Sequence, residues 1–314
     1  MQMSSVFISQ SSSICKFNSE SWVILNPIEQ RIKAKIEAVG TPLKDWDIQI
    51  NYGIKTGFNE AFIISGEKRK ELIEQDPKSE EIIRPILRGR DIKKYDYDFA
   101  NLWLINTHNG VKEKNIKPVN INDYPAIKRW LDFGGIAYNG KVFEGYKQIE
   151  KRADQGSTPY NLRNCAYMED FSKQKILWAE TMRIHKSDIN NFPRFGFAAA
   201  DFLTDKTCFF ATGMQLYYVL AYLNSSLGRY LCKRYVSILD NGGYLMQKVY
   251  LESMPIIRPT DAQVQDIESL CKKNIDGHKN KYDHAINEKI YAFYGFSQKE
   301  IEYIVNDSFE PLSR

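Results

Sequence analysis

The sequence predicts an α+β fold with a mixed sheet, a long core helix and a helical C-terminal tail. Short apolar runs bounded by Gly, Pro and Asn recur through the first two thirds of the 314-residue chain, a pattern typical of strands. An apolar stripe at helical spacing follows Gly213. Two capping boxes lie near the C-terminus. The strands and helices do not alternate regularly, which argues against a parallel βαβ fold.

Residues 1–45 are predicted to be an N-terminal linker segment that contains one helix. Pro27 suits the first helical turn, where its missing N–H is not needed. Ile32 and Ile36 follow at helical spacing. Gly40 is then expected to end the helix, because glycine adopts the backbone conformations of helix ends at little cost.

Strands and short helices are predicted to alternate irregularly after this segment. Ser65 is expected to start a charged helix that Asp76 stops, and Ser79 to cap a further helix that the turn at 88–91 closes. Five alternating or continuous apolar stretches are expected to be strands: 47–52, 61–64, 102–105, 175–178 and 195–200.

A long core helix is predicted after Gly213. Ser225, Ser226 and Gly228 are expected to bend it. Its apolar stripe consists of Leu216, Val219, Leu220, Leu223, Leu227, Tyr230 and Leu231.

The chain is divided into the linker segment, a central domain at 46–258 and a helical C-terminal subdomain at 259–314. Thr260 with Gln263, and Ser297 with Glu300, have the spacing of capping boxes that start helices.

The composition predicts a globular cytoplasmic protein. Hydrophobic residues make up 43% and charged residues 26%, with a formal net charge of +4, which suits both nucleic-acid binders and many enzymes. No apolar run approaches the roughly 20 residues of a membrane-spanning helix. Residues 1–17 lack the basic start and apolar stretch of a secretory signal. Five scattered cysteines predict reduced, mostly buried thiols, and a zinc site is not expected.

Complete catalytic motifs are missing from the sequence. It has no GxxxxGK[ST], GxGxxG or GxSxG pattern. Asn26 and Pro27 lack the second proline and the aromatic residue with which DNA methyltransferases grip an adenine. A nuclease would need clustered carboxylates and a lysine around a metal, and the nearest approach is Asp76 with Asp91 and Lys93. We therefore expect no catalysis by this chain alone.

Cations combined with amides and aromatic residues point instead to DNA. Arg and Lys neutralise phosphates, while Asn, Gln and Arg can read base edges. The candidates for phosphate binding are Lys55, Arg88, Arg90, Lys93, Lys233, Arg234 and Lys248. The candidates for approaching bases are Arg152, Gln155, Asn161, Arg163 and Gln247, and Tyr160 is a further candidate for DNA binding.

Each group also has a structural interpretation. The turn at Lys55 and the run from Arg88 to Lys94 fit solvated surface equally well. A long loop is predicted at 134–164, and its part at 147–163 is harder to explain in that way, because long loops in compact domains are usually functional or disordered. Its aromatic residues argue against disorder.

Five segments, in the same order along the chain, resemble the C-terminal specificity domain of TaqI-type adenine methyltransferases, as found in large single-chain type II restriction-modification proteins. The resemblance extends over residues 22–306. The segments are Gly53–Ile64, Ile86–Ile92, Arg152–Gly156 with Pro159–Cys165, Leu223–Leu227 and Tyr250–Ile256.

The resemblance implies target recognition on double-stranded DNA. In that family a separate catalytic domain binds S-adenosylmethionine, and the target adenine is flipped out of the duplex. This chain lacks that domain, so we expect a methyltransferase module, with or without a nuclease that uses Mg²⁺, in the same or a partner polypeptide. The resemblance thus favours a fragment of a longer protein or a separate specificity subunit.

Two other hypotheses stay open at this point. One is a metal-dependent nuclease that uses Asp76, Asp91 and Lys93. The other is a protein-interaction module whose helical tail docks a partner.

Overall fold

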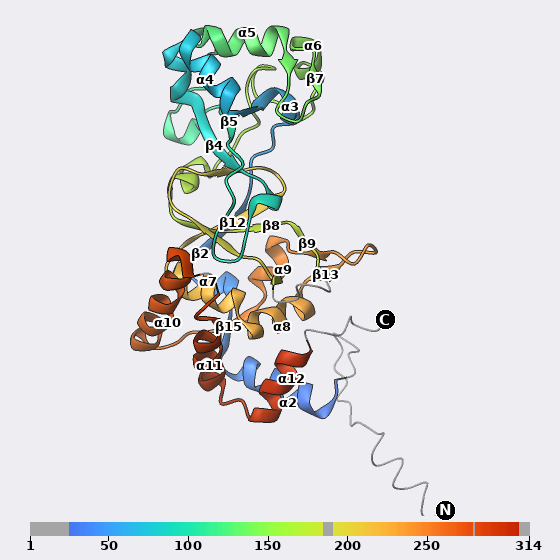
Figure 1. Cartoon of the computed structure of the whole chain (residues 1–314), viewed down its shortest axis with the longest axis vertical. Coiled ribbons are helices and arrows are strands. Elements are labelled where there is room, and N and C mark those ends of the chain that lie inside the picture. The colour runs from blue at the N-terminus through green and yellow to red at the C-terminus, as the bar shows by residue number, and fades with distance from the viewer. Residues whose placement is uncertain (1–24, 185–190, 279, 308–314) are drawn as a thin grey trace, which may run out of the picture.

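The computed structural model describes residues 25–184, 191–278 and 280–307, and it confirms the α+β class. The molecule is elongated, with an upper and a lower lobe joined through a narrower middle (Figure 1). Each lobe has its own cluster of buried hydrophobic residues. The Ser- and Trp-containing stretch before Leu25, whose features were part of the linker prediction, lies outside the described residues.

A four-stranded antiparallel sheet separates the two buried clusters. Along β8, Ile176 and Trp178 belong to the lower cluster and Leu177 to the upper one, because successive side chains point to opposite faces. The order is β10-β8-β12-β2, and the strands are β2 (Ile48–Tyr52), β8 (Lys175–Ala179), β10 (Gly196–Ala198) and β12 (Cys208–Gly213).

The upper lobe is built on a second sheet, of order β11-β4-β5-β3, which is mixed because β11 and β4 are parallel. Its strands are β3 (Ile63–Ser65), β4 (Ile83–Leu87), β5 (Leu102–Ile105) and β11 (Leu203–Thr204). Its helices are α3 (Asn59–Phe62), α4 (Gly66–Gln75), α5 (Pro125–Phe133) and α6 (Tyr146–Ile149), with a hairpin of β6 (Gly135–Ile136) and β7 (Val142–Phe143).

Several sequence predictions fail in this lobe, among them the start of the strand at 61–64, because residues 61 and 62 belong to α3. The helix predicted after Ser79 is a 3₁₀ turn followed by β4, and Ser79 does not cap it: its side chain is buried and donates to Asp76. Pairing with β5 and β11 outweighs the local helix signal. The predicted loop at 134–164 contains β6, β7 and α6, and α5 was not foreseen.

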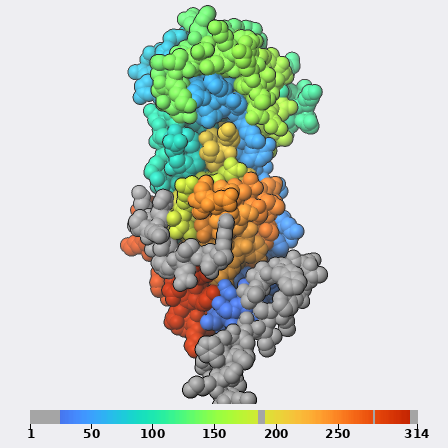
Figure 2. Space-filling model, turned by 90° about the vertical axis from the view of Figure 1, so that its right-hand side faces the viewer, coloured from blue at the N-terminus to red at the C-terminus, as the bar shows by residue number. Residues whose placement is uncertain are grey.

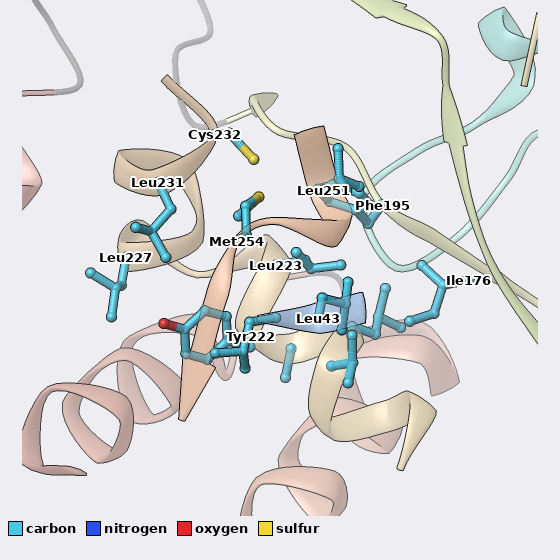
Figure 3. Packing of buried hydrophobic residues seen from close by; sticks show 14 of the residues in the cluster. Leu43, Ile176, Phe195, Tyr222, Leu223, Leu227, Leu231, Cys232, Leu251 and Met254 are labelled. Atoms are coloured by element: carbon cyan, nitrogen blue, oxygen red, sulfur yellow. The ribbon is translucent and has the colours of Figure 1, made fainter. Parts of the chain in front are cut away.

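The lower lobe contains the predicted core helix, broken into two helices. They are α7 (Leu216–Asn224) and α8 (Ser226–Tyr235). Ser225 has an extended backbone, and its side chain accepts from Gly228 N, so it caps the second helix. The stripe is buried as predicted, and Figure 3 shows Tyr222, Leu223, Leu227 and Leu231 in this core.

The termini of the described chain pack on the same lower core. The helix α2 (Pro27–Val39) has an Asn26 capping box and ends at Gly40, as the sequence predicts for its bounds. The tail helices are α10 (Asp261–Lys273), α11 (Asp283–Tyr294) and α12 (Gln298–Asn306), and both predicted capping boxes are present. The division at 45/46 and 258/259 stays a prediction, since buried residues from both terminal segments share one cluster with α7 and α8.

Smaller elements complete the chain. The remaining strands are β1 (Gly40–Pro42), β9 (Thr181–Met182), β13 (Ser237–Ile238), β14 (Tyr244–Leu245) and β15 (Pro255–Ile257), and the remaining α-helix is α9 (Lys248–Glu252). Turns of 3₁₀ helix lie at Leu43–Asp45, Pro77–Ile82, Gly89–Asp91, Lys112–Lys114, Ile121–Asp123 and Met168–Ser172, and Asn274–His278 forms a kinked π-helical turn.

Candidate nucleic-acid interface

Three chain segments run in parallel and leave the sheets at one edge, between the lobes. Thr204 pairs with Leu87 in the parallel β11–β4 contact, and Ile54 forms a parallel bridge with Asp205. Backbone hydrogen bonds of 2.7 Å (Ile54 N to Thr204 O) and 3.0 Å (Asp205 N to Leu87 O) fix the three segments. The residues that follow them therefore emerge together.

Those emerging residues are rich in cations. Lys55, Lys206 and Arg90 are exposed, and none of the three has a hydrogen bond or ion pair with a described residue. Lys55 lies over the ring of Tyr52, with 5.3 Å between its Nζ and the ring centroid. Lys206 was not foreseen from the sequence, although the polar Asp-Lys-Thr triplet between two apolar runs marks an exposed turn.

Arg88 has a different role from Arg90. Its Nε and Nη2 donate to the two carboxylate oxygens of Asp91 at 3.0 and 2.8 Å, and its backbone N donates to the same carboxylate. Asp91 is buried, and this bidentate bond raises the pKa of the Arg88 guanidinium. Arg88 thus fixes the turn that presents Arg90 to solvent.

Thr207 links the turn to the lower part of the molecule. Its hydroxyl accepts from Gly89 N at 2.9 Å, and its carbonyl accepts from Glu180 N at 2.8 Å. Glu180 in turn accepts from Met246 N through its backbone and from the Gln247 side chain at 3.4 Å. Gln247, one of the predicted base-reading residues, therefore lies beside this edge.

We name Lys55, Arg88, Arg90, Lys206 and Gln247 the waist cluster. Figure 2 shows this face, with the blue, teal and gold segments that carry the first four residues meeting between the upper lobe and the orange β13–β14 region. Burial and the charge of Glu60 raise the pKa of the Tyr138 hydroxyl group. Arg88 and Arg90 partly oppose this rise. Tyr138 was likewise missed by the sequence analysis.

The loop at 150–164 is organised around Arg152, which is buried. Its guanidinium donates to the carbonyl oxygens of Thr56, Asp154, Pro159 and Asn161 and lies 4.4 Å from the Phe62 ring centroid. Burial lowers the pKa of Arg152 to about 10. This corrects the prediction that Arg152 approaches bases: it holds the loop and ties it to the segment carrying Lys55.

The other loop candidates divide by exposure. Asn161 is buried, donates to Val119 O at 2.9 Å and accepts from Thr158, so its predicted base contact is corrected to a structural role. Tyr160 is half-buried and donates to Asp132, and burial together with this bond raises its pKa to about 12. Two residues remain on the surface: Gln155 is exposed, and Arg163 is exposed with an ion pair of 3.0 Å to Asp154.

Comparison with known proteins identifies the chain. The family model of the TaqI-like C-terminal specificity domain matches residues 84–256, more than half of the chain. The chain belongs to this family. That stretch contains Arg88, Arg90, Lys206, Gln247 and the loop at 150–164.

Two solved structures share the fold of this specificity domain. The type IIL restriction-modification enzyme MmeI, solved in complex with DNA, superposes with a TM-score of 0.56 at 15% identity, over 84% of this chain and 35% of that one. The type IIG restriction endonuclease BpuSI gives 0.53 at 14% identity, over 90% and 32%. The chain therefore spans about a third of each of these structures. None of the curated proteins matches it.

Two predicted phosphate ligands of the specificity domain lie at the end of α8 in the lower lobe, where Lys233 is buried and Arg234 half-buried. The Lys233 side chain is 1% exposed and pairs with Asp307 at 3.5 Å. Arg234 binds Asp307 at 2.8 Å and Glu29 at 3.1 Å, with its guanidinium 3.5 Å from the Tyr230 ring centroid. The predicted phosphate contacts of both cations are corrected to a structural role, because their charges are met inside the fold.

Lys93 and Lys248 are exposed but paired. Lys93 lies 3.2 Å from Asp98, and Lys248 lies 3.5 Å from Glu252 one helical turn away. Exposed pairs of this kind contribute little and open easily, so both lysines stay candidates for phosphate contacts.

The nuclease hypothesis finds no matching geometry in the described residues. Both oxygens of Asp91 accept from Arg88, and Asp76 caps the turn that follows α4. Among the described residues, no three His, Cys, Asp or Glu side chains gather as a metal site would require.

Within the same residues, no helix combines the length and apolar character of a membrane span. Cys165, Cys208, Cys232 and Cys271 are free thiols, and three of them are buried.

Proposed function

We propose that this chain is the DNA target-recognition part of a type II restriction-modification protein with adenine methyltransferase and endonuclease activities. The observation that carries the proposal is the waist cluster, in which three exposed cations, without a hydrogen bond or ion pair to any described residue, follow parallel segments at one edge. Membership of a specificity-domain family supports the same role.

The cations and the amides have different tasks in this proposal. Lys55, Arg90 and Lys206 bind phosphates and set the position of the duplex, a contact that carries no sequence information. Gln247, with Gln155 and Arg163 of the neighbouring loop, reads base edges, because amide and guanidinium groups can form paired hydrogen bonds to adenine or guanine. Arg88 and Arg152 keep these groups in place.

Catalysis belongs to other modules. The methyltransferase would bind S-adenosylmethionine and receive the flipped adenine, and a nuclease module would use Mg²⁺. This chain presents the recognition surface opposite them, either within one polypeptide or as a subunit of a cytoplasmic complex.

The direct test is a titration of the purified chain with random and genomic duplexes at two salt concentrations, followed by sequencing of the bound fragments. Salt-sensitive binding with an enriched motif is the expected result, because phosphate contacts release counterions. Salt-sensitive binding without enrichment would assign sequence reading to another module. Indifference to DNA, together with capture of a partner protein, would replace the proposal by the protein-interaction alternative.

A further inference from the structure

The upper lobe has an exposed apolar tip beside the waist cluster. Phe133 is 79% exposed at the end of α5, and Ile136 and Val142 are each 65% exposed on the β6–β7 hairpin. Ile136 and Val142 are direct cross-strand partners, so their side chains share one face of the hairpin. Exposed apolar side chains that share one face, as Ile136 and Val142 do, mark interaction sites more often than scattered ones.

The tip stands on a rigid base. Phe143, next to Val142, is buried and packs 5.2 Å from Trp130 and 5.8 Å from Phe58 between ring centroids. The Trp130 indole donates to Ala61 O at 2.8 Å. A rigid base means that little conformational entropy is lost when the tip enters a binding partner.

Glycine at the base of the hairpin makes this geometry possible. Gly134 has φ +74°, and a Cβ there would lie 1.9 Å from Phe143 O. Two turn hydrogen bonds, from Ala137 N to Lys141 O and from Gly140 N to Ala137 O, close the hairpin at 2.8 and 2.9 Å. The backbone of the hairpin is thus fixed both at its base and at its turn.

Charged side chains of both signs lie near the tip. Arg129 is exposed on α5, and the Lys141 side chain is 71% exposed while it approaches Glu60 at 3.4 Å. Glu60 also accepts from Asn139, so this carboxylate is already bound by two donors. Glu144 is exposed and remains as an opposing charge.

The hairpin is also continuous with the waist cluster. Asn139 and Lys141 of its turn bind Glu60, at 3.1 and 3.4 Å, on the segment that follows Lys55. Figure 1 places β7 on the side of the upper lobe that Figure 2 turns toward the viewer, above the waist. A duplex held by the waist cluster would therefore lie next to the tip.

We propose that Phe133, Ile136 and Val142 form an apolar wedge that enters a groove of the bound duplex and contacts the bases, distorting the DNA. This inference rests on the proposed function. Apolar side chains of this kind are used by DNA-bending proteins to unstack a base step and kink the duplex. The wedge would add affinity and shape selectivity without any phosphate contact.

The test compares the full chain with the double variant I136S/V142S on a pool of random-sequence duplexes. The double variant is expected to bind about ten-fold or more weakly, with the same dependence of affinity on salt, because no counterion-releasing contact is lost. Fluorescence energy transfer between labels at the duplex ends should report less bending. Val39→Ser, at a 46% exposed valine of α2 in the lower lobe, is the matched control and should behave as wild type.

The outcomes separate the two proposals. Wild-type binding that the double variant retains unchanged, in affinity and bending, would overturn the wedge and leave the proposed function standing. Unchanged DNA binding with loss of association to a methyltransferase module would also overturn it, and would make the tip a protein contact. A wild-type chain that binds no duplex at either salt concentration would overturn both.

Discussion

Two pairs of cations that look alike in the sequence differ in how far carboxylates of the fold bind them. Lys233 and Arg234 end a core helix and are bound by Asp307 and Glu29. Arg88 and Arg90 follow a strand, and only the first is bound by a carboxylate, that of Asp91, leaving Arg90 free of described partners.

The difference shows what makes a basic residue available to DNA. A buried cation such as Lys233 would have to give up its carboxylate before it could bind a phosphate, at a cost of several kcal/mol. An unpaired exposed cation loses only its hydration and releases counterions from the duplex. Availability, and not basic character, therefore separates Lys55, Arg90 and Lys206 from the pair at the end of α8.

The largest effect is expected from breaking the buried pair. Asp307→Asn removes the carboxylate that faces Lys233 and Arg234 in the lower lobe core. Stability in urea unfolding should fall by about 3 kcal/mol, because loss of one partner leaves buried charge poorly compensated. The salt dependence of DNA binding should not change, and a reduced slope would mean that these cations contact phosphates after all.

Arg152→Ala should have the next largest effect. Four backbone carbonyls lose their donor, and we expect a loss of about 2–3 kcal/mol in unfolding free energy. Hydrogen exchange should accelerate across residues 153–163. Arg152→Lys is the matched control: a single ammonium cannot span the same carbonyls, so the lysine should rescue little. Full rescue would contradict the structural role.

A base-reading residue should change specificity at one position. Arg163→Ala is expected to cost about 1–3 kcal/mol of discrimination at a single base pair, measured by sequencing of selected duplexes. The surface ion pair with Asp154 is weak, so folding should be preserved. An equal loss of affinity for all sequences would contradict base reading and indicate that Arg163 contacts the DNA phosphate backbone.

The smallest effect is expected from an exposed cation that already has a partner. Lys93→Ala should reduce the salt slope by less than one unit, because its ion pair with Asp98 competes with phosphate. Asp98→Asn removes that competition and should tighten binding slightly. Equal slopes for Lys93→Ala and Arg90→Ala would show that the ion pair has no influence.

Much of the fold was predictable because its signals are local. The bounds of α2 and the starts of α10 and α12 follow from caps within a few residues of each helix. The strand β4 could not be predicted, because Pro85 lies within it and the pairing that stabilises it comes from β5 and β11, later in the chain. The break in the core helix was foreseen at Ser225 but not as a complete interruption.

The candidate site was predictable only in part. Lys55 and Arg90 could be chosen because turn residues after strands tend to be exposed. The role of Lys233 could not, because its partner Asp307 lies 74 residues away in the sequence. Burial of Arg152 depends on Thr56, 96 residues earlier. Spacing along the chain carries no information on such contacts.

The most direct test of the central claim is the salt dependence of DNA binding by the double variant R90A/K206A beside the wild-type chain. Loss of two phosphate contacts should lower the slope of log affinity against log salt by about two units and weaken binding to all sequences alike. The enriched motif should stay the same. An unchanged slope, or a changed motif with an unchanged slope, would contradict the assignment of Arg90 and Lys206 to the DNA backbone.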